Sequence, residues 1–164
     1  MGRSELLLVL GALVIFGRFS LIVNNALLES STRVLESEFE ITAVSLLQEI
    51  IYEAGLQAFD SASVSTIPAS VPGGFTPAGA LGSESGETYP DFNDVDDFNG
   101  SSITGTTIAG MDYTITTDVG YVTAGDLVTF SSTQTTMKRM NLTLSSVYLR
   151  NDIKLSYVYS FIRE

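Results

Sequence analysis

The chain contains no cysteine, no histidine and no tryptophan among its 164 residues. Without cysteine it forms no disulfide and carries no thiol chemistry, and the redox state of its compartment stays open. Without histidine it lacks the side chain that most often serves as a general base or a metal ligand. These absences favour a structural or binding protein over an enzyme.

Basic residues are scarce as well. The chain has 8 Lys and Arg against 19 Asp and Glu, which gives a formal net charge of −11. Binding to phosphates needs clustered Lys and Arg, so we expect no direct nucleic-acid binding. Most of the acidic residues follow residue 28, so we expect that part to face water. The length fits one domain, alone or with an appendage.

A long apolar run stands out near the start. It is uninterrupted from Leu6 to Phe16 and reaches Val23 only if Arg18 is included. A transmembrane helix needs about 20 apolar residues, and a charge near the bilayer centre costs about 2.5–3.5 kcal/mol. The run lacks the basic front and the A-x-A cleavage pattern of a secretory signal. A helix apolar on every side needs a cover, which a bilayer or identical helices would provide.

The residues from 24 to 59 have a helical period. Polar side chains recur there at steps of three and four residues, as in Glu36 and Glu40, and no proline occurs before Pro68. We therefore predict one helix to about Phe59, apolar at 1–23 and amphipathic at 24–59. Its apolar face widens after Ile41, as expected where a helix packs on a sheet.

The remainder is predicted to be a loop region followed by a sheet. Residues 60–100 are rich in Ser, Pro and Gly and then in acids. Within 101–164, apolar and polar residues alternate in the segments 111–121, 139–144 and 153–161, and Leu127–Phe130 is a shorter fourth candidate strand. This period predicts an antiparallel sheet with one buried face. The expected fold class is α+β: a long N-terminal helix with a protruding apolar half, and a second half packed on the sheet.

These features together resemble a family, the type IV pilins, in their mature and processed form. The sequence has Met1, then Glu5, then LLLVLGALVIF, and DFNDVDDFNG and TMKRMNLTLSS…DIKLSYVYS are similar to stretches of bacterial pilins and pilin-like proteins. The resemblance implies a major pilin that polymerises through its N-terminal helix into an extracellular filament at the cell surface. Adhesion, twitching motility, DNA uptake and aggregation all stay open as the role of this filament. It also implies an inner-membrane stage before assembly, a prepilin peptidase and an assembly machinery.

The resemblance implies roles for three residues. Met1 would carry an N-methylated amine, and Glu5 would pair with the N-terminal ammonium of a neighbouring subunit. A carboxylate packed among apolar helices needs such a cation, and the pairing would fix the axial register of the subunits. Alternatively, Glu5 is an ordinary acidic residue at the membrane–water interface, where a membrane helix ends. Arg18 would either meet Glu29 or Glu36 of another copy or extend its side chain along the helix to water.

The acidic turn is a candidate calcium site. Oxygen ligands are dense there, and Ca²⁺ takes six to eight of them. The candidates are Asp91, Asn93, Asp94, Asp96 and Asp97. The spacing is not that of an EF-hand, and a turn held by bonds from Asp and Asn side chains to the backbone is the alternative. No other cofactor is expected.

Two sequons, at Asn99 and Asn141, match the N-glycosylation pattern. Two other functions stay open beside the major pilin. One is a minor pilin or a secretion-system pseudopilin, and the other is a membrane-anchored extracytoplasmic binding domain that never polymerises. An enzyme is the least favoured reading, because no acid is placed against a recognisable nucleophile or base.

Overall fold

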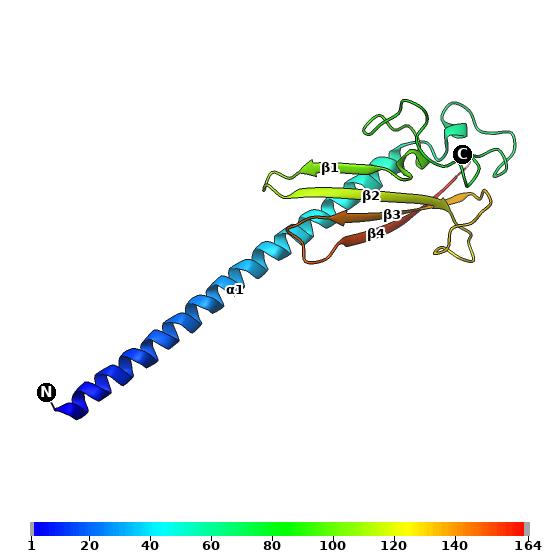
Figure 1. Ribbon diagram of the computed structural model, residues 1–164. Coiled ribbons are helices and arrows are strands. Elements are labelled where there is room, and N and C mark those ends of the chain that lie inside the picture. The colour runs from blue at the N-terminus through cyan, green and yellow to red at the C-terminus, as the bar shows by residue number, and fades with distance from the viewer. Residues whose placement is uncertain (1, 163–164) are drawn as a thin grey trace. The chain divides into compact units, whose positions relative to one another are not determined.

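The computed structural model describes residues 2–162, apart from the side chain of Leu6. These residues form one long helix and a four-stranded antiparallel sheet, so the predicted α+β class is confirmed (Figure 1). The chain divides into two units, one up to Glu38 and one from Phe39 onward. The helix α1 contributes residues to both units, and each unit is described separately below.

Helix α1 runs from Arg3 to Leu56 without a break. No proline interrupts it, and half of its residues are good helix formers such as Leu, Ala and Glu. It ends three residues before the predicted Phe59. Just beyond the end of the helix, Ala58 forms an isolated parallel bridge with Asp94.

The sheet has the order β1-β2-β3-β4, and every neighbouring pair is antiparallel. Its strands are β1 Ser102–Thr106, β2 Asp112–Tyr121, β3 Met137–Ser145 and β4 Ile153–Ser160. Figure 1 shows the four strands side by side in this order. Sequential strands pair directly, so short connections suffice and no crossover is needed.

The core of the second unit lies between α1 and one face of the sheet. Helix residues Leu47 and Ala54 are completely buried, and they belong to one cluster with Ile115, Met140 and Leu142 of the sheet. The Tyr159 hydroxyl on β4 also donates to the Ile51 carbonyl of α1 at 2.8 Å. The second half of the helix therefore packs on the sheet, as its widened apolar face predicts.

One predicted strand is wrong. Leu127–Phe130 is not a strand; the fourth strand is β1 instead. The Arg139 guanidinium donates to the carbonyls of Leu127 and Val128, at 3.2 and 2.9 Å. Phe130 lies against Gly120, where a Cβ would come within 2.5 Å of the ring. These contacts hold the segment against the sheet as a loop.

Between α1 and β1 the chain forms loops with two short 3₁₀ helices, Ser61–Ser63 and Asp96–Phe98. The second of these is called η2 below. Phe92, Val95 and Phe98 are buried in the core cluster and fix the acidic segment against the domain. Phe92 and Phe98 meet edge to face, with ring centroids 4.9 Å apart.

Candidate functional site

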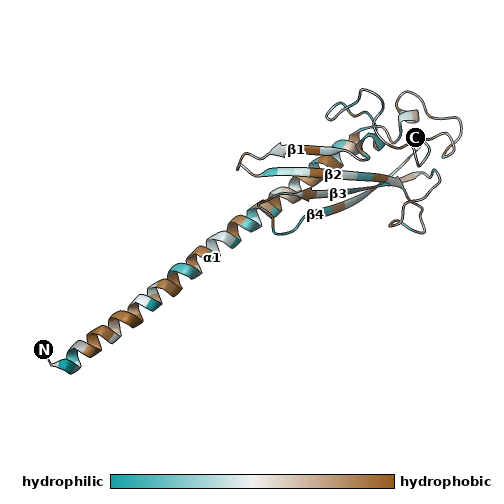
Figure 2. Cartoon of the chain, in the orientation of Figure 1, coloured by the Kyte–Doolittle hydropathy of each residue, from teal (hydrophilic) through white to brown (hydrophobic). Residues whose placement is uncertain are grey.

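The first candidate site is the apolar part of α1. Its side chains are exposed in every described position up to Leu35. Leu8 is 74% exposed, and Ile15 is 71% exposed. Figure 2 shows apolar residues along this part of α1 on every visible side. The helix is long and apolar enough to cross a membrane by length and composition.

Glu5 lies in the first turn of α1, beside the predicted assembly end. Its carboxylate accepts the Gly2 backbone N–H at 3.0 Å. This contact is half of a capping box, in which an acid at the third helical position satisfies a free N–H at the helix start. Glu5 also carries a negative charge where the positive end of the helix dipole stabilises it. Its proposed partner Met1 lies outside the described residues.

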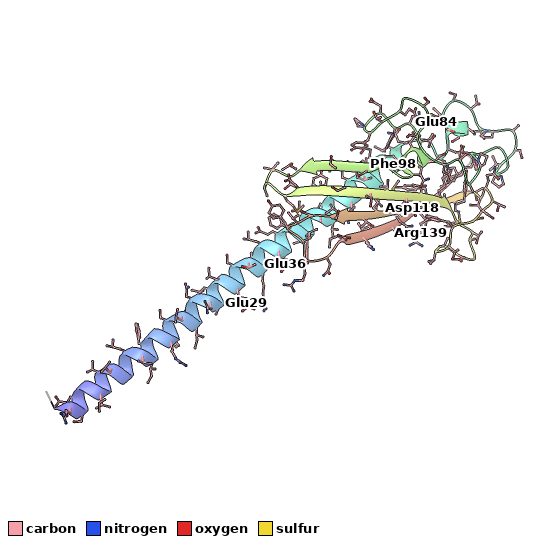
Figure 3. All side chains as sticks on the ribbon, viewed as in Figure 1. Glu29, Glu36, Glu84, Phe98, Asp118 and Arg139 are labelled. Carbon is pink, nitrogen blue, oxygen red and sulfur yellow. The ribbon has the colours of Figure 1, made fainter. Side chains whose placement is uncertain are left out.

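Arg18 is exposed in the apolar part of the helix. Within residues 2–162, no ion pair and no hydrogen bond of its side chain is present. Glu29, one of its predicted partners, instead contacts Arg33 of its own chain, with nitrogen and oxygen 2.6 Å apart. Figure 3 labels Glu29 and Glu36 on the helix.

The structure separates the five predicted calcium ligands. Asp91 is exposed, whereas Asp94, Asp96 and Asp97 are buried. Asp96 pairs with Lys138. Asp94 Oδ1 accepts the N–H groups of Asp96 and Asp97, at 2.8 and 3.3 Å, in the way predicted for a turn. The five residues therefore do not converge on one point.

Burial raises the pKa of two acids of this segment. Burial, together with the neighbouring carboxylates of Asp96 and Asp97, raises the pKa of Asp94 to about 9. Burial therefore favours the neutral form of this side chain. Burial also raises the pKa of Asp97, although backbone N–H groups of Asn93 and Asp94 oppose this, and the charge of Glu84 adds to the increase.

Another cluster of carboxylates does converge. Glu84, Glu87 and Asp97 each place one carboxylate oxygen within 4.8 Å of the others. The sequence prediction contained Asp97 but neither glutamate. The glutamates come from the Ser/Gly-rich loop, and only the folded chain brings them to η2.

The structure also contains a buried ion cluster that the sequence analysis missed. The Lys138 ammonium lies 2.7 Å from Asp60 and 2.6 Å from Asp96, and all three side chains are almost completely buried. Lys138 also donates to the Phe59 carbonyl at 2.8 Å. The alternation along β3 contains a signal for this cluster. Lys138 lies two residues before Met140, so it faces inward together with Met140, Leu142 and Leu144.

The two sequons differ in their surroundings. The Asn99 side chain donates to the Leu81 carbonyl at 3.0 Å and accepts the Val119 N–H at 2.9 Å. Both the nitrogen and the oxygen of the Asn99 side-chain amide are thus engaged within the fold. Asn141 is half-buried on β3, where its carbonyl oxygen accepts the Ser156 hydroxyl at 2.8 Å.

Comparison of the chain with protein-family models, with curated proteins and with solved structures gives no match.

Proposed function

We propose that this chain is a structural subunit, a major pilin, that polymerises through its N-terminal helix into a type IV pilus-like extracellular filament. One observation carries the proposal: the long run of apolar side chains on α1 that the described chain leaves exposed. Leu7 is 69% exposed, Phe16 is 69% exposed and Ile22 is 66% exposed. In water such a surface is strongly unfavourable, so it needs a permanent apolar environment.

The same segment would serve twice. Before assembly it would hold the subunit in the inner membrane, and after assembly it would be buried among identical helices in the filament. Removing this much apolar surface from water gains on the order of tens of kcal/mol, at about 25 cal/mol per Å². Because lipid and a helix bundle are both apolar, the difference at assembly is far smaller. Extraction from the membrane would therefore need work from an assembly machinery.

Glu5 would select the neighbour. In the single chain its carboxylate already caps the Gly2 N–H. A carboxylate has about four acceptor positions, so this cap leaves room for a neighbour's ammonium. Among apolar helices, the Glu5 carboxylate and the neighbour's ammonium would each lack another group of opposite charge. They would therefore attract each other strongly, at one axial position only.

The best-supported second function is a membrane-anchored extracytoplasmic domain that does not polymerise. It rests on the same apolar helix, which fits a single crossing of a bilayer. A minor pilin or a secretion-system pseudopilin is the third, and it would assemble in the same way but in few copies. If the chain is a pilin or a pseudopilin, the prepilin peptidase and the inner membrane are also its partners.

Replacing Glu5 separates these functions. We expect Glu5→Ala to leave the chain in the membrane fraction and to reduce the sheared extracellular fraction at least tenfold. Glu40→Ala, an exposed acid of the same helix, is the matched control and should assemble like the wild type. If Glu5→Ala yields as many filaments as the control, the assembly role of Glu5 is wrong. If the wild type is found only in membranes, the anchor is the correct function.

A further inference from the structure

The carboxylates of Glu84, Glu87 and Asp97 form a cluster of acidic groups in which one member is buried. Asp97 is 1% exposed, Glu87 is half-buried and Glu84 is exposed. The cluster is therefore closed on the side of the domain and open to solvent on the other. Figure 3 labels Glu84 in the loops and Phe98, the neighbour of Asp97, at the start of the sheet.

The buried member of this cluster, Asp97, has an unpaired acceptor. Asp97 Oδ2 accepts the N–H groups of Asn93 and Asp94, at 2.8 and 3.1 Å. Asp97 Oδ1 is buried and has no hydrogen-bond partner. A buried carboxylate oxygen without a donor is costly, because it loses water and gains nothing in return. This unpaired oxygen is an observation separate from the clustering, and a bound cation would satisfy it.

No side chain of the described residues supplies that cation. Within residues 2–162, no Lys or Arg forms an ion pair with Glu84, Glu87 or Asp97. Lys138, the buried cation of the domain, is held by Asp60 and Asp96 at 2.7 and 2.6 Å. Within the described part of the chain, no Lys or Arg side chain therefore pairs with the acids of the cluster.

The three side chains are held in place by their surroundings. The Asn93 side-chain amide donates to Glu87 Oε1, and the Glu84 N–H donates to Glu87 Oε2 at 3.3 Å. The Glu87 N–H in turn donates to the Glu84 carbonyl at 3.1 Å, which closes a turn. On the other side, η2 is anchored by Phe98 in the core. The turn at residues 84–87 and the helix η2 are therefore held where their carboxylates can bind one ligand.

We propose that Glu84, Glu87 and Asp97 bind a calcium ion that ties the loop at residues 84–87 to η2. The donor set consists of carboxylate oxygens alone, which suits hard cations and not zinc or copper. Oxygens on opposite sides of a Ca²⁺ ion lie about 4.6–5.2 Å apart, since each Ca–O distance is about 2.3–2.6 Å. The three carboxylate oxygens lie within 4.8 Å of one another, so one ion between them can contact all three.

Calcium fits this cluster better than magnesium. Carboxylates bind Ca²⁺ through one oxygen or two, so three of them supply three to six ligands, and water on the exposed side of Glu84 completes six to eight. Mg²⁺ demands a near-ideal octahedron with shorter distances and gives up its water reluctantly. We expect half-saturation at about 0.1–1 mM Ca²⁺, as in extracellular calcium modules.

Calcium titration of the full chain in detergent micelles tests the proposal. After treatment with a chelator, added CaCl₂ should produce a saturable binding heat and a higher midpoint of thermal unfolding, followed by circular dichroism. MgCl₂ at equal concentration should have a clearly smaller effect. Glu84→Gln should weaken Ca²⁺ binding at least tenfold while the protein stays folded, because the residue is exposed. Glu87→Gln should do the same.

Asp91→Asn is the matched control, because Asp91 is an exposed acid of the same segment outside the cluster. This variant should bind Ca²⁺ like the wild type. The proposal is overturned if the wild type shows neither heat nor a shifted midpoint up to 10 mM CaCl₂, where a site of the expected affinity is saturated. It is also overturned if MgCl₂ has an equal effect, or if Glu84→Gln and Asp91→Asn behave alike.

Discussion

The ammonium nitrogen of Lys138 lies 2.7 Å from a carboxylate oxygen of Asp60, and both side chains are completely buried. The same Asp60 carboxylate accepts the Tyr121 hydroxyl at 2.8 Å and the Thr76 N–H at 3.0 Å. The pair thus joins β3, β2 and the loop after α1. A buried ion pair with its remaining hydrogen bonds satisfied specifies how these segments pack.

Removing the cation should be strongly destabilising. In Lys138→Met, the carboxylates of Asp60 and Asp96 remain buried without a counter-charge, which costs about 3–5 kcal/mol of unfolding free energy. Lys154→Met, an exposed lysine on β4, should change the stability by less than about 0.5 kcal/mol. Urea unfolding of the full chain in micelles measures both. A loss below 1 kcal/mol in Lys138→Met would contradict a structural role for the pair.

Asp60 should make the stability depend on acid. Burial opposes its ionisation, but the hydrogen bond and charge of Lys138 outweigh this and hold the pKa of Asp60 below its usual 3.8. A carboxyl group with a lowered pKa stabilises the fold above its unfolded pKa, and the contribution is lost as pH falls through the folded pKa. We therefore expect wild type and Asp60→Asn to differ most above pH 4 and to converge below it. Unfolding measured from pH 2 to pH 7 tests this, and a constant difference would contradict it.

The docking of the helix on the sheet can be tested with two helix residues. Leu47 is completely buried and Ile41 is 65% exposed. Leu47→Ala should cost about 2–5 kcal/mol, because it leaves a cavity beside the sheet. Ile41→Ala should cost less than about 0.5 kcal/mol. Equal losses in urea unfolding would mean that this part of α1 does not form the core described above.

Arg18 is expected to act between subunits. Arg18→Leu removes a charge that has no partner in the described chain, so membrane insertion should stay intact or improve. The filaments should lose an ion pair between copies and dissociate at a lower temperature. Arg33→Leu is the control, because Arg33 already pairs with Glu29 of its own chain. Filaments of Arg18→Leu with unchanged resistance to heat and shear would show that Arg18 only extends to water.

The sequence predicts the elements with strong periods and misses those without one. The absence of proline and the three- and four-residue steps predict α1, and alternation predicts β2, β3 and β4. Strand β1 was missed because its sequence SITGT has one large apolar side chain, Ile103, and so no visible alternation. Leu127–Phe130 shows the reverse: its apolar residues suggested a strand, but Arg139 and Gly120 hold it as a loop.

The candidate calcium site shows a different limit. Density of acids along the sequence pointed to residues 91–97, yet a turn directs successive side chains to different sides. Asp96 turns to Lys138, while Asp97 turns to Glu84 and Glu87. Which acids meet depends on how a loop of some ten residues folds back on η2. No local pattern encodes such a contact, because it is made between segments and not within one.

Electron microscopy of the fraction sheared from the cell surface tests the central proposal most directly, combined with identification of the repeating protein. The account predicts thin filaments in which this chain is the main repeating component and in which residues 6–23 of many copies are packed together in the interior. A cell surface without such filaments, with the whole chain retained in the membrane, would contradict it.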